Sequence, residues 1–474
     1  MKLVGGALTA GMLVLARPLA AQRPFLSDQV KQRFVAIDTA VIAITGVTVI
    51  DGRGGPAVRG QTVVIRDGRI ADLGAGIAIP AGAYRIDGSG KTVIPGIVGM
   101  HDHMFYTAAG GFANQMSFTA PKLYLASGVT TVRTTGGRSP YADINLRKVV
   151  DSGLAPGPRI HVTTPYLTGG EFAGSMFATD SPEAARRFVA YWASEGVSWV
   201  KFYTDVSRAT MKAAIEEAHR HGMKTTGHLC SVTFSEAMDL GLDDFAHGAI
   251  TATDFVAGKE PDKCPTNALR VSDSLASGDN PVAKALIAKM VRKGVSMTTT
   301  MPIYEALYPH RPVTDERSLE LMAPPVRAAY VANRQFIDST SNYVFTTAGF
   351  TRLLSFDKAF YAAGGLLGNG VDPTGNGGAL PGFGDQRGYE LLREAGLTTE
   401  QAVQVVTLNG AKILGVAKDL GSVEKGKTAD LVLLDGDLTA EPSVIRKVVT
   451  VFKGGVGYDP KRLIDAVRGR VGID

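Results

Sequence analysis

Clustered positive charge is missing from this sequence, although basic residues are in slight excess. The 474 residues carry a formal net charge of +5, and the lysines and arginines are scattered along the chain. No basic stripe alternates with aromatic residues, as it does on surfaces that bind nucleic acids. We therefore expect no nucleic-acid partner, and a mildly cationic surface favours anionic substrates only weakly.

Cysteine is scarce, since Cys230 and Cys264 are the only two. Both are expected in loops at the same end of the fold described below, where they could pair in an oxidising compartment. Two free buried cysteines are the alternative, and the sequence leaves both open. No cysteine follows the N-terminal apolar run, so lipid attachment there is not expected.

Long apolar runs are absent except at the N-terminus. Lys2 precedes the apolar residues 3–16, and the small residues around Ala21 offer a cleavage site, a pattern typical of a signal peptide. The run is short for a membrane span, although a retained anchor is the alternative. We expect residues 1–21 to be removed and the mature protein to be periplasmic or secreted, without stable membrane association.

Both ends of the remaining chain have a residue pattern that is typical of strands and turns. In residues 36–92, alternating Val/Ile runs are separated by Asp-Gly and Gly-Gly turns, and residues 421–457 repeat this pattern. The simplest topology joins the two segments into one small β-sandwich domain. Residues 93–420 would then form the second domain, and residues 458–474 a C-terminal tail.

Strands and helices alternate in the region between these ends. Helical patterns such as 181–196 and 208–222 close near a glycine, and they separate eight apolar strand candidates. The candidates are residues 94–103, 129–136, 159–167, 198–205, 224–230, 243–250, 295–302 and 366–372. Eight strands alternating with helices predict an α/β protein with a (β/α)8 TIM barrel. Residues 304–365 are too long for one connection and are expected to hold extra helices over the active face.

A glycine-rich nucleotide-binding turn is also absent. None follows the first predicted strand, which argues against the rival doubly wound sheet. The glycine-rich segment 375–384 is not followed by Gly-Lys-Ser/Thr and is therefore no phosphate cradle. It could close over a substrate or be a surface loop, and the sequence does not decide between them.

Two pairs of histidines share the same spacing but differ in their predicted backbone. His101 and His103 end the first barrel strand, where alternate side chains share a face and can reach one ion. His219 and His221 lie in a predicted helix, where residues two apart face different directions. Basic residues before Gly222 suit a helix C-terminus. The first pair is therefore predicted to bind metal and the second to be structural.

Four further residues with potential ligand groups fall on later strands. Lys201 lies on the fourth strand, His228 on the fifth and His247 on the sixth, and Asp372 ends the eighth. Each alone has an ordinary explanation, such as a core histidine, a surface lysine or a turn-forming aspartate. Together with the first histidine pair, they gather at the barrel rim that carries chemistry in this fold. The combination predicts a metal centre.

Several segments resemble the amidohydrolase superfamily. VIPGIVGMHDH, WVKFY, TGHL, FAHG and GVDPTG are similar to its metal-ligand strands. LLREAGLTTEQAVQVVTLNGAKILG and LGSVEKGKTADLVLLDGD are similar to its C-terminal helices and to its return to the β-domain. The resemblance covers nearly the whole mature chain and is nearest to imidazolonepropionase-like and Xaa-Pro-dipeptidase-like members. Asp372 is followed by Pro373-Thr374 rather than by a small residue, a departure that concerns the rim loop.

The resemblance implies a binuclear centre with two divalent ions, and zinc is the metal that we expect. Lys201 would be N-carboxylated, because an ammonium cannot bind a cation whereas a carbamate can bridge two. The implied ligands are His101, His103 and Asp372 for the first ion, His228 and His247 for the second, and Lys201 for both. A hydroxide between the metals would attack the substrate carbonyl.

Two residues are expected to assist this reaction. Asp372 would take the hydroxide proton and pass it to the leaving amine. Tyr203 shares a strand face with Lys201 and could donate a hydrogen bond to the developing oxyanion, with packing at the rim as its alternative role. Arg133 could bind a substrate carboxylate, but a salt bridge inside the barrel is the favoured interpretation.

The expected activity is hydrolysis of an amide bond in a small carboxylate-bearing molecule, such as a dipeptide or an N-acyl amino acid. The same centre would also suit lactones, cyclic amidines or phosphotriesters. A non-catalytic exported protein that captures metal or ligand is the alternative from another class, although a complete ligand set with an open position favours catalysis. The expected partner is a small-molecule substrate, and homo-oligomerisation is left open.

Overall fold

The computed structural model describes residues 23–473, except for 108, 112, 171–175, 312–315, 341–343 and 376. The expected signal peptide at residues 1–21 lies outside the described residues. Among the helices that are described, none combines the length and the apolar character needed to cross a membrane.

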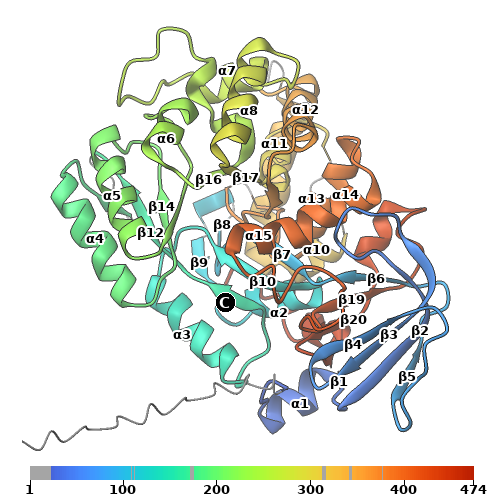
Figure 1. Ribbon diagram of the computed structural model, residues 1–474. Coiled ribbons are helices and arrows are strands. Elements are labelled where there is room, and N and C mark those ends of the chain that lie inside the picture. The colour runs from blue at the N-terminus through green and yellow to red at the C-terminus, as the bar shows by residue number, and fades with distance from the viewer. Residues whose placement is uncertain are drawn as a thin grey trace, which may run out of the picture.

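Parallel strands form the centre of the larger region, and helices cover its outside (Figure 1). One sheet contains β7 (Ile97–Asp102), β10 (Val129–Thr134) and β11 (Arg159–His161). The other has the order β13 (Phe177–Ala178), β12 (Thr163–Thr168), β14 (Trp199–Phe202), β15 (Lys224–Gly227), β16 (Asp244–Ala246), β17 (Ser296–Thr299) and β18 (Leu367–Asn369). Each of the eight predicted strand segments contains one of these strands, and the α/β class is confirmed.

The third predicted strand is divided between the two sheets. β11 pairs in parallel with β10, whereas β12, beyond Val162, pairs in parallel with β14. At the other junction, the N–H of Asp372 donates to the carbonyl of His101 at 2.8 Å, but no ladder between β18 and β7 is found within the described residues. The strands thus follow one another in the order that a TIM barrel requires, without a detected closing ladder.

The outer helices have the start and stop signals that the sequence predicts. Ser181 and Ser207 accept hydrogen bonds from the first turns of α4 (Pro182–Ser194) and α5 (Arg208–Arg220). Gly294 adopts the left-handed conformation that ends α8 (Pro281–Lys293). Other helices of this layer include α3 (Pro140–Asp151) and α6 (Phe234–Leu240), and the expected extra helices after residue 304 are α10 (Glu316–Leu321), α11 (Pro324–Ser339) and α12 (Thr347–Ala362).

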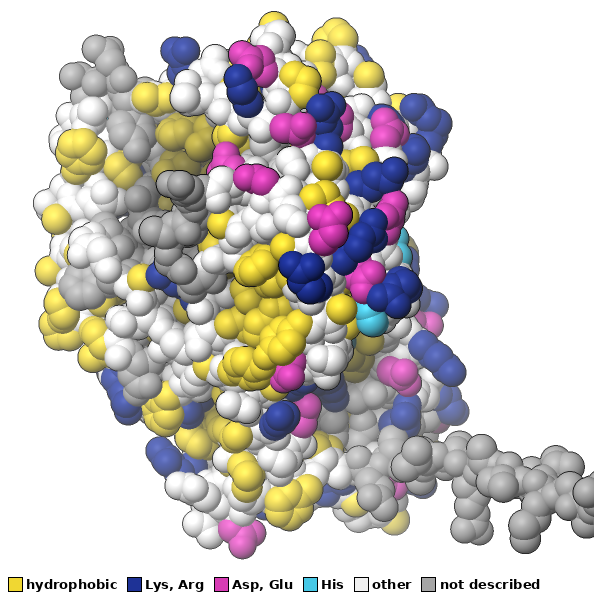
Figure 2. All heavy atoms as spheres, turned by 90° about the vertical axis from the view of Figure 1, so that its left-hand side faces the viewer, with side chains coloured by type: hydrophobic (Ala, Val, Ile, Leu, Met, Phe, Trp, Pro, Cys, Tyr) yellow, Lys and Arg dark blue, Asp and Glu magenta, His cyan; other side chains and the backbone are white. Residues whose placement is uncertain are grey.

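The face that carries α4 and α5 shows basic and acidic side chains intermingled (Figure 2). An ion pair of 2.7 Å between Arg186 and Glu216 joins these two neighbouring helices. Charge on this face is therefore balanced locally rather than gathered by sign.

Both chain ends meet in one nine-stranded sheet (Figure 1). Its order is β1 (Val35–Ile37), β21 (Val456–Tyr458), β20 (Val448–Lys453), β19 (Leu431–Leu434), β6 (Thr92–Pro95), β2 (Val41–Val49), β3 (Val58–Arg66) and β4 (Arg69–Gly74), with β5 (Tyr84–Asp87) paired to β2. β2 pairs with β5 along its first half and with β6 at its end, so the strands from both chain ends are hydrogen-bonded into one continuous sheet. The sheet surrounds its own apolar core, which includes Ile44, Val63 and Phe452.

Gly96 marks the passage from this sheet to the parallel strands. The N–H of Gly96 donates to Asp430 in the C-terminal segment, and the next N–H, of Ile97, donates to Gly128 beside β10. A Cβ on Gly96 would lie 2.2 Å from the hydroxyl of Thr130, so only glycine fits at this approach. The first parallel strand therefore starts at Ile97, within the predicted segment 94–103, because residues 92–95 belong to β6 of the nine-stranded sheet.

The segment expected to be a tail is packed against the rest of the protein. It contains α16 (Pro460–Asp465), and Leu463 and Val471 are buried. Val471 also forms an isolated bridge with Met322, just before α11. The C-terminal residues up to 473 are thus part of the folded body.

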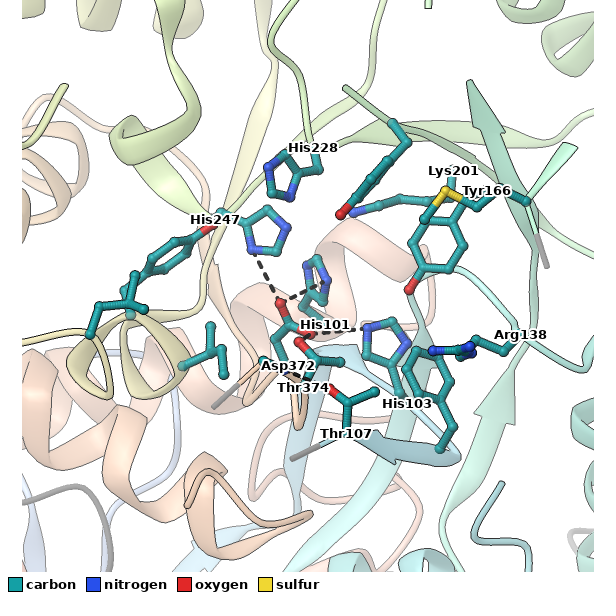
Figure 3. Close-up of a pocket in the computed structure, with 17 residues that line it drawn as sticks. His101, His103, Thr107, Arg138, Tyr166, Lys201, His228, His247, Asp372 and Thr374 are labelled. Carbon is teal, nitrogen blue, oxygen red and sulfur yellow. Dashed lines mark hydrogen bonds and ion pairs between the residues drawn. The ribbon is translucent and has the colours of Figure 1, made fainter. Parts of the chain in front are cut away.

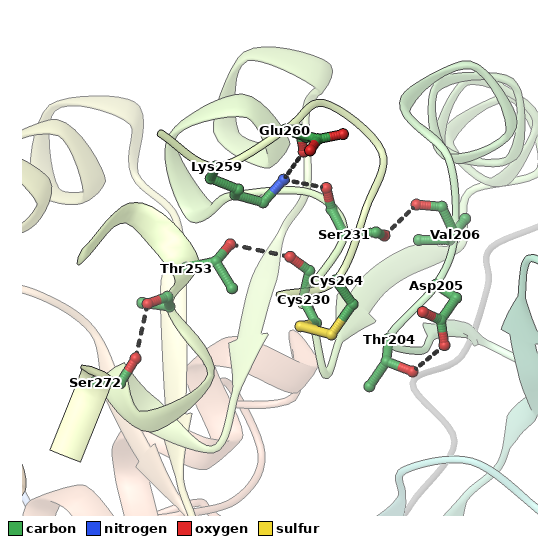
Figure 4. Close-up of a disulfide and its surroundings, with 11 residues drawn as sticks. Thr204, Asp205, Val206, Cys230, Ser231, Thr253, Lys259, Glu260, Cys264 and Ser272 are labelled. Atoms are coloured by element: carbon green, nitrogen blue, oxygen red, sulfur yellow. Dashed lines mark hydrogen bonds between the residues drawn. A yellow bond between two sulfur atoms is a disulfide. The ribbon is translucent and has the colours of Figure 1, made fainter. Parts of the chain in front are cut away.

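Cys230 and Cys264 form a disulfide (Figure 4). Cys230 lies shortly after β15, and Cys264 lies in the long connection that leads to α7 (Ala268–Leu275). Nearby, the hydroxyl of Thr253 and the amine of Lys259 donate to the carbonyls of Cys230 and Ser231. Of the two alternatives left open by the sequence, the structure contains the paired form, which fastens this connection to the end of β15.

Candidate metal centre

A cavity of about 420 Å³ opens at the carboxyl ends of the parallel strands (Figure 3). Of the described residues, 17 line it, and these include every predicted site residue: His101, His103, Lys201, Tyr203, His228, His247 and Asp372. The sequence positions explain this convergence, because each residue lies at the end of a parallel strand or shortly beyond it.

Asp372 is the hub of the cluster. One of its carboxylate oxygens lies 3.2 Å from His103 Nε2, and the other lies 3.8 Å from His101 Nε2 and 3.5 Å from His247 Nδ1. The ligand atoms of His101, His247 and Asp372 all lie within 4.8 Å of one another, and all three residues are buried. The ring of His228 is 4.4 Å from that of His247. The resemblance grouped His247 with His228 as ligands of the second ion. In the structure, His247 lies close to His228 and also to His101 and Asp372, which were expected at the first ion.

Two members of the cluster have a left-handed backbone. His247 has a φ of 74° and Asp372 a φ of 48°, a conformation that costs a residue with a side chain about 1–3 kcal/mol. Neighbouring strands hold both backbones in place, because the N–H of His247 donates to Thr298 at 2.9 Å and that of Asp372 donates to His101. Strain of this kind is typical of functional sites.

Hydrogen bonds orient the donor groups. His103 Nδ1 lies 3.0 Å from the carbonyl of Gly136, which fixes the ring so that Nε2 faces Asp372. His247 Nδ1 lies 2.9 Å from the hydroxyl of Thr300. The hydroxyl of Thr374 donates to Asp372 Oδ1 at 2.9 Å.

Two buried nitrogen atoms in the cavity have no hydrogen-bond partner among the described residues. They are His101 Nδ1 and Lys201 Nζ, and a buried polar atom left in this state is costly. In Figure 3 the Lys201 amine points toward the histidines. Burial lowers the pKa of Lys201 to about 7. The amine is thus held, unpaired, beside the groups that would bind a cation.

Burial keeps the imidazoles of His101, His228 and His247 neutral, whereas the Asp372 carboxylate stays charged. Burial, assisted by the charge of Lys201, lowers the pKa of His101 and brings that of His228 to about 3. Burial alone would raise the pKa of Asp372, but the hydrogen bond and charge of His103 hold it below its usual value. Neutral imidazoles beside a carboxylate are the forms that bind divalent metals. The donor set therefore fits a metal ion.

Comparison with known proteins identifies the family of this chain. The model of the amidohydrolase family matches residues 92–239 and 385–457, which include four of the six predicted ligands: His101, His103, Lys201 and His228. The chain belongs to the amidohydrolase superfamily. It is a metal-dependent amidohydrolase, which hydrolyses carbon–nitrogen bonds.

Relatives of this amidohydrolase cover most of its length. A dihydroorotase from Pelotomaculum thermopropionicum is 26% identical over 425 residues, which is 84% of this chain and 90% of that protein. The structure of a candidate prolidase from Bifidobacterium longum is 25% identical, with a TM-score of 0.62, and the match covers 90% of this chain and 98% of that one. A Xaa-Pro dipeptidase with methionine bound in its active site is 20% identical, with a TM-score of 0.65, and the match covers 88% and 100% of the two chains.

Two residues considered in the sequence have different positions in the amidohydrolase. Tyr203 lines the cavity, with its ring 5.0 Å from that of His228. Burial raises the pKa of Tyr203, so its hydroxyl keeps its proton and can donate. Arg133 instead forms a fully buried salt bridge of 2.8 Å with Asp244, which confirms the favoured interpretation.

The glycine-rich segment after Asp372 is largely packed. Residues 377–382 are buried, and the N–H of Gly375 donates to the hydroxyl of Thr107 at 2.6 Å. Thr107 ends β8 (Phe105–Thr107), which lies beside the cavity. The described part of this segment is therefore anchored to the rim and is not a free surface loop.

Sequence reasoning missed several residues that shape the cavity. They are Phe105, Thr107, Arg138, Tyr166, Met176, Ile303, Tyr304, Leu307, Thr374 and Gly375. Many of them lie in connections, where no periodic pattern marks a residue as facing the site. The Gly-Gly-Arg-Ser-Pro sequence after the second predicted strand was the one available signal for Arg138, since loops at this end of a barrel carry function.

Proposed function

We propose that this amidohydrolase cleaves an amide C–N bond in a small carboxylate-bearing substrate, such as a dipeptide or an N-acyl amino acid. The proposal rests on one observation, the convergence of neutral imidazoles, Asp372 and the unpaired Lys201 amine in a cavity of small-molecule size. Likeness to a candidate prolidase supports the dipeptide class.

The proposed cofactors are two divalent ions, with zinc as the proposed metal, and N-carboxylated Lys201 would be a ligand of both. Formation of the carbamate joins the Lys201 nitrogen to carbon dioxide and releases one proton. This reaction would replace a buried amine that has no partner with an anion suited to cations. The remaining ligands are His101, His103, His228, His247 and Asp372. When bound, the metals would lower the pKa of a water molecule and polarise the scissile carbonyl.

The protein groups then handle the proton and the developing charge. Asp372 takes the proton from the attacking water and delivers it to the leaving nitrogen, as general base and then as general acid. Thr374, hydrogen-bonded to Asp372 Oδ1, keeps the carboxylate in place during both transfers. The half-buried, protonated Tyr203 hydroxyl donates to the oxyanion that forms on the carbonyl.

We also propose that the two parallel sheets together form one (β/α)8 barrel, which the strand order and the family support. Export to the periplasm or to the medium is proposed from residues 1–21. The disulfide between Cys230 and Cys264 supports this, because such bonds persist in oxidising compartments.

Metal analysis and a substrate panel test the function. The purified, metal-loaded protein should contain two ions per chain and should hydrolyse dipeptides or N-acyl amino acids faster than lactones or phosphotriesters. Full amide turnover without stoichiometric metal would overturn the mechanism, and faster lactone cleavage would reassign the substrate.

The carbamate has a direct test of its own. Protein equilibrated with ¹³C-labelled bicarbonate should give a carbamate carbon signal by NMR, and the Lys201→Gln variant should lack it. A wild-type spectrum without this signal, recorded on active protein, would exclude the carboxylated lysine.

A further inference from the structure

The cavity contains one cationic side chain that the mechanism does not use. Among the described residues that line it, Lys201 lies with the metal ligands, whereas the exposed Arg138 lies in the connection between β10 and α3. Within the described part of the chain, the Arg138 guanidinium has no hydrogen bond and no ion pair, and its contact is with the Phe105 ring. Arg133, by contrast, is fully buried and forms a salt bridge with Asp244.

Arg138 lies one aromatic ring away from the ligand cluster. Its guanidinium carbon is 5.8 Å from the centre of the Phe105 ring, and that ring centre is 4.4 Å from the ring of His103. Figure 3 shows Arg138 on the same side of the cavity as His103 and Tyr166. One residue of peptide spans about 3.8 Å. The two distances together span at most about 10 Å, or fewer than three residues, so a substrate of dipeptide size can reach from Arg138 to the histidines.

The wall of the cavity beside His247 is largely apolar. It is lined by Ile303 and Tyr304 of α9 (Met301–Glu305), together with Leu307. The ring of Tyr304 is 5.6 Å from that of His247, so this wall adjoins the His247 flank of the cluster. The cavity therefore has a cation beside His103 and an apolar wall beside His247.

We infer that Arg138 determines specificity by binding the free carboxylate of the substrate, while an apolar acyl group or N-terminal side chain packs against α9. The planar guanidinium can bind a carboxylate through two parallel hydrogen bonds, which a lysine cannot do. The preferred substrates are thus N-acyl amino acids and dipeptides with an apolar acyl side and an unblocked C-terminal carboxylate. This inference rests on the proposed function and names the end of the substrate that the same cavity recognises.

The test compares a carboxylate with its neutral amide in Arg138→Gln, by binding as well as by turnover. The binding probes are N-acetyl-L-leucine and N-acetyl-L-leucinamide, titrated calorimetrically into metal-free and metal-loaded protein. The wild type should bind the carboxylate probe more tightly than the amide. Arg138→Gln should weaken carboxylate binding about 10- to 100-fold and leave amide binding unchanged, as expected for a lost hydrogen bond to a charged group. Equal carboxylate binding by wild type and variant would overturn the inference.

Two further variants separate specificity from general damage. Arg138→Lys retains the charge without the planar fork and should recover only part of the carboxylate preference. Arg66→Gln removes an exposed arginine at the end of β3, in the nine-stranded sheet, and should leave both probes unaffected. A similar loss of carboxylate binding in Arg66→Gln would show a general charge effect and would overturn the role of Arg138.

Turnover distinguishes this inference from the proposed function. With a dipeptide and its C-terminal amide as substrates, Arg138→Gln should raise KM for the dipeptide more than it lowers kcat. If the wild type cleaves the dipeptide and the variant keeps the wild-type ratio of kcat/KM for the two substrates, the inference fails and the function stands. If the metal-loaded wild type cleaves neither, the proposed function fails, and the binding comparison still decides the role of Arg138.

Discussion

Two histidine pairs with the same spacing in sequence lie in different environments in this protein. His101 and His103 lie at the end of β7, each is 1% exposed, and both approach the carboxylate of Asp372. The strand repeat of two residues places both rings on one side. The same spacing at the end of α5 belongs to His219 and His221, where the helical repeat separates the two rings.

The helical pair has two different partners at the surface. His219 Nε2 lies 2.9 Å from the carboxylate of Asp243, and His221 Nε2 lies 3.1 Å from that of Glu217. The two imidazoles thus each pair with a different carboxylate. The comparison shows that the period of the backbone, rather than the spacing in sequence, decides whether two histidines can hold one ion.

Removing each pair should give the largest contrast. We expect the double variant His101→Asn/His103→Asn to lose bound metal and to fall to background turnover, because two neutral nitrogen ligands disappear. His219→Asn/His221→Asn should keep the wild-type metal content and a kcat/KM within about two-fold, as is usual for surface changes. Metal analysis and steady-state kinetics on both variants measure this, and metal loss in the helical variant would contradict the comparison.

Asp372→Asn should separate proton transfer from metal binding at the strand end. Asparagine tolerates the left-handed backbone, so the loop should keep its shape. We expect most of the metal to remain and kcat to fall about 10²- to 10⁴-fold, the usual contribution of general acid–base catalysis. Asp67→Asn is the matched control, because Asp67 has a φ of 49° in the nine-stranded sheet region, far along the chain from the ligands. Unchanged turnover in Asp372→Asn would remove its proton role.

The disulfide is expected to stabilise the fold at the end of β15. Replacing Cys230 and Cys264 with serine removes a cross-link that closes a sequence separation of 34 residues. We expect the free energy of unfolding to fall by about 3–4 kcal/mol, as the chain-entropy model predicts for a loop of this size. Urea titrations with and without reductant give the value. Reductant should destabilise the wild type and leave the serine variant unchanged.

Glu217→Gln should have the smallest effect and should act on the helical pair alone. The hydrogen bond and charge of Arg220, with a further contribution from His221, lower the pKa of Glu217 from 4.5. A lowered pKa stabilises the fold above the unfolded value, and this stabilisation is lost as the pH falls through the folded value. The variant should be about 0.2–1 kcal/mol less stable at pH 7, with the difference disappearing at lower pH. Urea unfolding at pH 7, 5 and 3.5 checks this, and kcat at pH 7 should be unchanged.

Local patterns were sufficient to predict the strands and to bring the candidate ligands to one cavity at their ends. Apolar runs ending in His101 or containing Lys201 are short-range signals, and the structure has a strand in each predicted segment. The division at Val162 could not be predicted, because it depends on which neighbour each half of the segment meets. The position of His247 between both ligand groups also depends on a left-handed turn that no local sequence signal marks. Arg138, a single loop residue, gives no periodic pattern at all.

The junction at Gly96 has a consequence for the order in which the protein is built. β6, immediately before it, lies between β2 and β19, and β19 is formed by Leu431–Leu434 near the end of the chain. A chain still emerging from the ribosome lacks this second neighbour until synthesis is nearly finished. The strand bearing His101 is therefore anchored late, and a truncation before Leu431 would leave it attached to a half-paired edge.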